Sequence, residues 1–169
     1  CSALNYLHTQ RIPIIHGDIK PSNLMLTPEG DICLIDFNIS FYLDENTVLG
    51  YTDGYTSPEQ YLEVSARRRK NNTNRYVINE QSDIYSTGAT LYHLATGKKH
   101  SGYKEEMDFN LLTQILGEPF AGVIQKAVNV EPGERYATAM EMFRALQAIP
   151  KKDQRYRRML RAQQLRTVI

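Results

Sequence analysis

Apolar residues recur every three or four positions in five segments of the chain, which is the spacing of amphipathic helices. The first segment places Ala3, Leu4 and Leu7 on one face, and Pro13 is expected to stop that helix. The spacing predicts helices over residues 1–8, 82–97, 108–116, 120–129 and 138–149. Because five helical segments occupy much of the chain, the predicted fold class is mainly α.

Two of these segments carry clear helix-boundary signals. Ser82 is a suitable N-cap for the second helix, and Gly97 is expected to end it. Thr138 and Glu141 form the sequence pattern of a capping box at the start of the last helix. The predicted inward-facing residues of these two helices are Ile84, Gly88, Leu91, Leu94, Ala95, Met142, Phe143 and Leu146.

A short β-hairpin is predicted near the start of the chain. The stretch "NLMLTPEGDICLID" has two apolar runs around a Pro-Glu-Gly turn at 28–30, which is typical of two paired strands. Residues 38–81 lack sustained periodicity and are expected to form a long ordered loop with short helical pieces. No internal repeat is present, so the chain is expected to be helical with one small hairpin.

Composition fits one soluble domain. The chain has 169 residues, of which 41% are hydrophobic and 23% are charged, which is ordinary for a globular protein. The net charge of +1 argues against a dedicated nucleic-acid binder, and no apolar run is long enough for a membrane span. Two cysteines are too few for a disulfide framework, so a reducing, cytoplasmic setting is expected. The chain starts at Cys1 inside a helical pattern, which suggests a fragment.

Two polar segments stand apart from this composition. Residues 66–75, "ARRRKNNTNR", are basic and are interpreted as a surface insert. Residues 151–169 carry seven basic side chains against one acidic side chain, a net charge of +6. This tail is either a solvated helical extension or a segment that binds anionic lipid, which would place the protein at the cytoplasmic face of a membrane.

The most informative stretch is "IIHGDIKPSNLMLTPEGDICLIDFN", which sets polar groups between apolar runs. Because a hairpin folds back on itself, Asn23 and Asp36 should lie side by side, with Asp18 close by. An amide oxygen beside a carboxylate suits a divalent cation such as Mg²⁺. A second carboxylate could accept a proton from a hydroxyl, and Lys20 could neutralise charge on a transferred phosphoryl group. The pattern therefore predicts phosphoryl transfer.

These motifs resemble those of eukaryotic-type Ser/Thr protein kinases. "HGDIKPSN" is similar to the catalytic loop, usually written H-R-D-L-K-P-x-N, and "DFN" to the D-F-G motif. "GYTSPEQ" resembles the end of the activation segment, "SDIYSTG" the start of the long central helix, and "EPGERY" a late loop. The order and gaps agree, and the later runs look most like bacterial members.

The resemblance implies a role for each residue of the site. Asp18 would be the catalytic base, and Lys20 would contact the γ-phosphate of ATP. Asn23 and Asp36 would hold Mg²⁺, or Mn²⁺ in its place. Thr52 would sit beside Asp18 and Lys20 in the substrate cleft, and Lys20 with Thr52 is the Ser/Thr-type signature.

Four further residues would be structural. Glu59 and Arg135 would form a buried ion pair, and Asp83 would brace the catalytic loop from below. His16, among apolar neighbours, is expected to be a packed histidine rather than a base. The implied partner is a protein substrate with a Ser or Thr hydroxyl.

The resemblance also implies an architecture. Residues 1–149 would form the C-terminal lobe of the kinase, a helical bundle whose small hairpin carries the catalytic and metal-binding loops. The catalytic loop would span 16–23, the activation segment 36–59 and an insert about 61–81, followed by a basic extension at 150–169. No G-x-G-x-x-G occurs and no lysine precedes Lys20, so the N-terminal lobe that grips ATP is expected to be missing from these residues.

Two departures from the family pattern leave alternatives open. Gly17 replaces the Arg of H-R-D, which in the family links the catalytic loop to a phosphorylated activation segment. Asn38 replaces the Gly of D-F-G. The expected function is phosphate transfer to Ser/Thr, inactive or very weak in this fragment alone. The alternatives are a pseudokinase or docking scaffold, and a small-molecule phosphotransferase of the aminoglycoside or choline kinase type.

Overall fold

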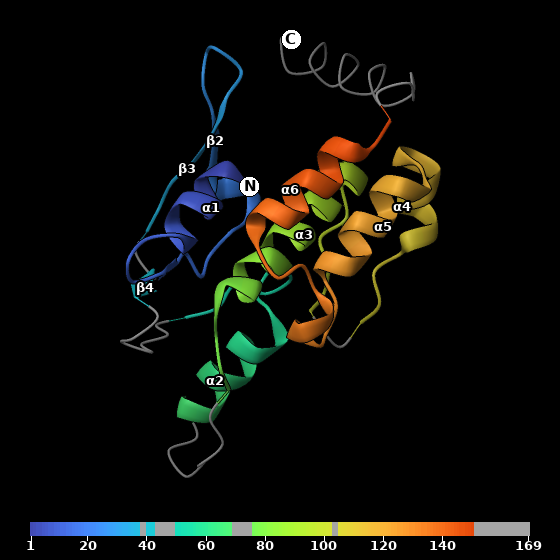
Figure 1. Cartoon of the computed structure of the whole chain (residues 1–169). Coiled ribbons are helices and arrows are strands. Elements are labelled where there is room, and N and C mark those ends of the chain that lie inside the picture. The colour runs from blue at the N-terminus through green and yellow to red at the C-terminus, as the bar shows by residue number, and fades with distance from the viewer. Residues whose placement is uncertain (38–39, 43–49, 69–75, 103–104, 151–169) are drawn as a thin grey trace.

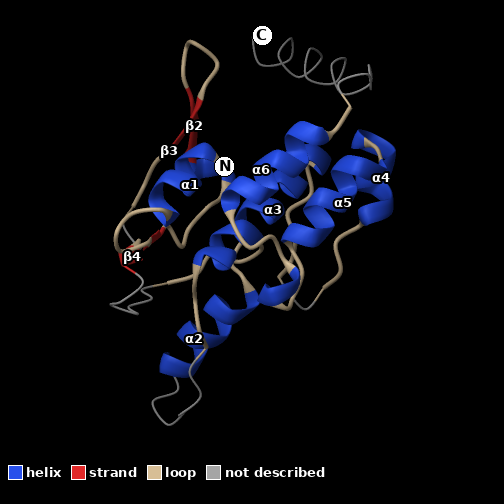
Figure 2. Ribbon diagram, in the orientation of Figure 1, coloured by secondary structure: helices blue, strands red, loops and turns tan. Residues whose placement is uncertain are grey.

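The computed structural model describes residues 1–37, 40–42, 50–68, 76–102 and 105–150. Within these ranges helices predominate and strands are short, as Figure 2 shows. The helices are α1 (Ser2–His8), α2 (Pro58–Arg68), α3 (Glu80–Thr96), α4 (Phe109–Leu116), α5 (Glu118–Ala127) and α6 (Ala139–Ala148), with 3₁₀ turns η1 (Pro21–Asn23) and η2 (Pro132–Glu134).

Helix α3 is the centre of the bundle. It packs against α4, α5 and α6, and α1 lies against α6 (Figure 1). On α3, Ile84 is fully buried and contacts the cluster that contains Met142, while Tyr85 and Tyr92 belong to a second cluster with Leu112. Burial of these side chains stabilises the bundle. It also determines how α3 is rotated, and therefore which of its residues face the catalytic loop.

The boundary of α3 corrects one sequence prediction. Asn79 is the N-cap, and its side chain accepts a hydrogen bond from the Gln81 amide. Ser82 lies inside the helix, fully buried, and donates to Glu59 instead. Gly97 ends the helix in the left-handed conformation, with φ of 69°, as predicted. The predicted inward position of Leu94 was wrong, because that side chain is 48% exposed.

Most other helix predictions hold with small changes of boundary. In α6, Thr138 accepts from the Glu141 amide, so the predicted N-cap is confirmed. The Glu141 carboxylate accepts from the Ala137 amide, one residue before the N-cap amide that a capping box would use. In α1, Leu4 and Leu7 are buried but Ala3 is exposed, which corrects the predicted face.

The predicted hairpin is confirmed. Strand β2 (Leu24–Leu26) pairs antiparallel with β3 (Ile32–Leu34), with Met25 opposite Cys33. A second pair, β1 (Ile14–Ile15) with β4 (Phe41–Tyr42), was not predicted. Each of its strands has only two residues, which is too short for an alternation of polar and apolar positions to be visible.

The segment between the hairpin and α3 is more regular than predicted. Helix α2 runs for 11 residues where short helical pieces were expected. Its end includes Ala66, Arg67 and Arg68 of the basic segment, and residues 69–75 lie outside the described residues. The basic tail at 151–169 also lies outside them.

Among the helices that the structure describes, none combines the length and the apolar character needed to cross a membrane.

Candidate active site

The centre of the site is a triangle of polar side chains from two distant loops. Thr52 Oγ1 donates to Asp18 Oδ1 at 2.7 Å, and Lys20 Nζ lies 2.7 Å from Asp18 Oδ2. Lys20 Nζ also donates to Thr52 Oγ1 at 3.2 Å. All three side chains are half-buried, so a carboxylate, an ammonium group and a hydroxyl meet at a surface that solvent still reaches.

Asn23 joins this triangle to the hairpin. It lies at the end of η1, directly before β2, and is buried. Its Nδ2 donates to the backbone oxygen of Asp18 at 2.8 Å and to Asp18 Oδ2 at 3.1 Å. These two bonds fix the amide so that its Oδ1 faces the other way, where the described residues give it one long contact of 3.4 Å from Ser22 Oγ.

The pairing of the hairpin places Asp36 one residue beyond the residue that is bonded to Asn23. The Ile35 amide donates to the Asn23 backbone oxygen at 2.9 Å, and Asp36 is the next residue. Its φ of 66° makes it the one non-glycine residue in the left-handed region among the residues described. Such a conformation costs about 1–3 kcal/mol and is concentrated at functional sites. Asn38 lies outside the described residues.

The donor set of Asn23 and Asp36 fits Mg²⁺. An amide oxygen and a carboxylate are hard ligands, and Mg²⁺ is usually held by one or two carboxylates together with phosphate oxygens and waters. No group of three or more His, Cys, Asp or Glu side chains is placed to hold a metal in the described part of the chain.

Asp83 supports the catalytic loop from α3. Its carboxylate is fully buried and accepts from the His16 amide and the Gly17 amide, each at 2.9 Å. His8 Nε2, from α1, lies 2.9 Å from the same carboxylate. One side chain therefore fixes the backbone immediately before Asp18 to both the central helix and the first helix.

His16 links the catalytic loop to the hairpin and is fully buried. The Asp18 amide donates to its Nδ1 at 3.3 Å, so the proton is on Nε2, which donates to the Ile35 backbone oxygen at 3.3 Å. The ring holds Asp18 and the residue before Asp36 at a fixed separation.

Glu59 and Arg135 form a buried ion pair below the site. Arg135 donates to both carboxylate oxygens, at 2.8 and 2.9 Å, and Ser82 Oγ donates to Glu59 at 2.7 Å. Burial alone would raise the pKa of Glu59. The hydrogen bonds and charge of Arg135, together with Ser82, outweigh that effect and hold the pKa below its ordinary value.

Arg135 also stacks on Tyr85, and its remaining donors bind backbone oxygens of Gln81, Asn129 and Val130. The side chain is therefore saturated with partners, and it joins α2, α3 and the loop before α6.

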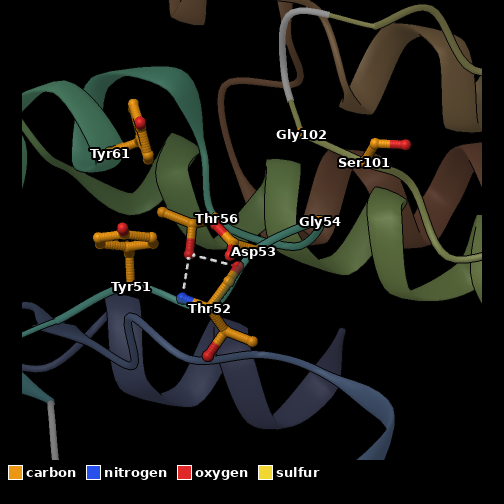
Figure 3. Close-up of a pocket in the computed structure, with 8 residues that line it drawn as sticks. All are labelled: Tyr51, Thr52, Asp53, Gly54, Thr56, Tyr61, Ser101 and Gly102. Carbon is orange, nitrogen blue, oxygen red and sulfur yellow. Dashed lines mark hydrogen bonds between the residues drawn. The ribbon is translucent and has the colours of Figure 1, made fainter.

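A pocket of about 140 Å³ is lined in part by Thr52 of the triangle (Figure 3). Tyr51 and Tyr61 line one side, and Ser101 lies across from them on a separate loop (Figure 3). Thr52 belongs both to this pocket and to the triangle, and its backbone is held by Thr56 Oγ1, which accepts from the Thr52 amide at 2.8 Å. Thr52 is therefore the residue that connects this pocket to Asp18, since its hydroxyl donates to the Asp18 carboxylate.

Gly54 lines this pocket, and a substitution there tests how closely the loop at His100 packs against it. Its φ is +82°, and a Cβ atom there would lie 2.2 Å from the His100 backbone oxygen. Gly30, in the hairpin turn, has a similar φ of +90° but nothing within 4 Å of a Cβ. Gly30→Ala should cost about 1–2 kcal/mol for the backbone conformation alone. We expect Gly54→Ala to cost about 1–3 kcal/mol more because of the collision.

Urea unfolding of both variants measures the difference between them. Equal losses of stability would show that the loop at His100 moves freely and does not pack on Gly54.

Sequence reasoning missed three residues that hold the site. His8, Gln60 and Ser82 each bind a group far away in sequence, at separations of 75, 43 and 23 residues. Gln60 follows Glu59 in "SPEQ", but its amino-acid type alone does not indicate what it contacts.

The fold and this arrangement of residues define a protein kinase lobe, and comparison with known proteins supports the same class. The family model for the protein kinase domain matches residues 1–157, so the chain belongs to the protein kinase family.

Curated relatives include the probable serine/threonine-protein kinase PknB of Corynebacterium glutamicum, 33% identical over 161 residues. That match covers 84% of this chain and 23% of the relative. Serine/threonine-protein kinase PknA of a Nostoc species is 34% identical over 164 residues, covering 85% of this chain and 26% of the relative. The chain thus spans about a quarter of the length of these relatives, and the predicted resemblance to bacterial Ser/Thr kinases is confirmed.

Among solved structures, the PknI kinase domain of Mycobacterium tuberculosis is similar, with a TM-score of 0.63 and 21% identity. The match covers 86% of this chain and 50% of that domain. This similarity shows the kinase fold, and it confirms the predicted helical lobe with a small hairpin.

Proposed function

We propose that this chain is the catalytic lobe of a Ser/Thr protein kinase, which transfers the γ-phosphate of ATP to a hydroxyl of a protein substrate. The observation that carries the proposal is the triangle of Asp18, Lys20 and Thr52 beside Asn23 and Asp36. Positioning and electrostatics supply most of the catalysis in phosphoryl transfer, and this cluster offers both.

Each side chain has a chemical task in this proposal. Asp18 orients the substrate hydroxyl and accepts its proton while that oxygen forms a bond to phosphorus and the bond to the β-phosphate oxygen breaks. Lys20 neutralises charge on the transferred phosphoryl group. Asn23 and Asp36 would hold Mg²⁺, which supplies charge neutralisation at the phosphates when bound. Thr52 places the substrate chain, since it contacts Asp18 and lines the adjacent pocket.

We further propose that the groups covering ATP come from outside these 169 residues. The sequence has no glycine-rich phosphate loop, and it aligns with 50% of the solved mycobacterial kinase domain. We therefore expect the isolated chain to bind Mg·ATP weakly and to transfer no phosphate. Isothermal titration measures this directly, and a dissociation constant in the low micromolar range would refute the expectation.

The proposed function is tested by phosphate transfer from labelled ATP, using the whole protein that contains this chain. A generic Ser/Thr protein and a set of small amines are assayed side by side, with Asp18→Asn as the control for contaminating kinases. Transfer to protein Ser/Thr that EDTA abolishes is the expected result. Transfer to the amines alone would support a small-molecule phosphotransferase. No transfer from folded protein would support a docking scaffold, which the departures at Gly17 and Asn38 would then explain.

The glycine at position 17 affects how the kinase activity is expected to be regulated. In the family the Arg at this position connects the catalytic loop to a phosphorylated activation segment, and glycine has no side chain for that contact. We propose that activity depends little on phosphate in the activation segment.

A further inference from the structure

A buried amide in α2 holds the catalytic loop and the substrate-side loop together. Gln60 is fully buried, and its Nε2 donates to the Gly17 backbone oxygen at 2.8 Å and to the Gly50 backbone oxygen at 3.1 Å. A side-chain amide has two N–H donors, so both are used. The two acceptors lie 43 and 10 residues before Gln60 in the sequence.

Both acceptors sit next to the triangle of Asp18, Lys20 and Thr52. Gly17 directly precedes Asp18, and Gly50 is two residues before Thr52, whose hydroxyl contacts Asp18. Asp83 accepts from the Gly17 amide and Gln60 donates to the Gly17 carbonyl oxygen, so both backbone polar groups of Gly17 are held by buried side chains. Because Gly17 has a φ of 77° and glycine is the most flexible residue, these two anchors restrict the backbone immediately before Asp18.

The oxygen of the same side chain indicates that Gln60 serves the site rather than stability. Gln60 Oε1 is buried and has no hydrogen-bond partner among the described residues. A buried acceptor without a partner lowers the stability of the folded state. An apolar side chain of the same shape would avoid that loss, but it could not donate to Gly17 and Gly50.

We propose that Gln60 is a positioning residue that fixes Asp18 relative to Thr52 without any phosphate. The inference rests on the proposed kinase function and supplies the link that Gly17 cannot form. Since the link is a buried, neutral amide rather than a charge pair, the geometry of the site should depend little on phosphorylation or on ionic strength.

The test replaces the donor while keeping the shape, with Gln60→Met in the whole protein. We expect kcat for phosphate transfer to fall by about 10- to 100-fold, because small displacements of reacting groups cost that much. The KM for ATP should stay unchanged, because the hydrogen bonds of Gln60 go to Gly17 and Gly50 and not to Asn23 or Asp36, the proposed Mg²⁺ ligands. Gln125→Met, on an exposed position of α5, is the matched control and should leave kcat unchanged.

Hydrogen exchange provides a readout that does not require activity. In Gln60→Met, amides in the peptides around 17–20 and 50–54 should exchange at least about tenfold faster, while those of α5 and α6 stay as in the wild type. Faster exchange throughout the protein, with kcat per folded molecule unchanged, would show a merely structural role and overturn the proposal. So would unchanged exchange in both peptides.

A second variant, Gln60→Glu, tests whether a change in packing alone explains the lower kcat of Gln60→Met. Its carboxylate has the same shape but would face two carbonyl oxygens, so we expect a loss of kcat at least as large as in Gln60→Met. Full kcat in Gln60→Glu would overturn the proposal. If the wild type transferred no phosphate, the kinase function would fail, and hydrogen exchange would still decide whether Gln60 joins the two loops.

Discussion

Asp18→Asn in the whole protein should lower the rate of phosphate transfer by about 10²- to 10⁴-fold, the usual contribution of a positioned general base. The amide has the same shape as the carboxylate but cannot accept the proton of the substrate hydroxyl. It also loses the charge that holds Lys20 Nζ at 2.7 Å, and its NH₂ group would face either Thr52 or the donors Lys20 and Asn23. The main loss should appear in kcat.

Transfer of labelled phosphate at saturating ATP measures this loss. Asp31→Asn is the matched control because it removes the same charge from an exposed carboxylate in the hairpin turn, and it should leave the rate unchanged. A loss smaller than tenfold in Asp18→Asn, with an unchanged melting temperature, would mean that Asp18 is not the base.

Arg135→Ala should destabilise the fold by about 3–5 kcal/mol, because it leaves the Glu59 carboxylate buried without its partner. For a protein of this size that corresponds to a fall in melting temperature of roughly 6–20 °C. The backbone oxygens of Gln81, Asn129 and Val130 lose donors as well. Thermal unfolding measures the change, with Arg144→Ala on the exposed face of α6 as the control.

The loss in Arg135→Ala should shrink as the pH falls. In the wild type the pKa of Glu59 is lowered, so the ion pair stabilises the fold above the ordinary pKa of 4.5 and is lost as the pH falls through the lower folded pKa. In the variant, burial without Arg135 raises the pKa of Glu59, which becomes neutral at a higher pH. The melting temperatures of the wild type and of Arg135→Ala should therefore approach each other below about pH 4.5. A gap that is constant with pH, or no gap, would contradict the assigned pairing.

Local signals in the sequence predicted most of the fold. The glycine that ends α3, the capping pattern of α6 and the Pro-Glu-Gly turn each act within a few residues, so the sequence alone identifies them. The ordered motifs likewise predicted that Asp18, Lys20, Asn23 and Thr52 would converge.

Long-range contacts decided what the sequence could not show. Ser82 suits a helix cap by type, but Glu59, which lies 23 residues earlier, makes it an interior donor. Leu94 is on the apolar stripe of α3, yet it is exposed because the neighbouring helices pack elsewhere. Gln60 depends on two backbone oxygens whose positions only the folded chain defines.

The carboxylate of Asp83 also sets the order of events during synthesis. It lies 67 residues after His16, whose backbone it holds. At about 5–20 residues per second, the ribosome delivers this anchor roughly 3–13 seconds after the loop itself. Until then the amides of His16 and Gly17 lack their acceptor, so the complete site can form only after translation has passed the midpoint of the lobe.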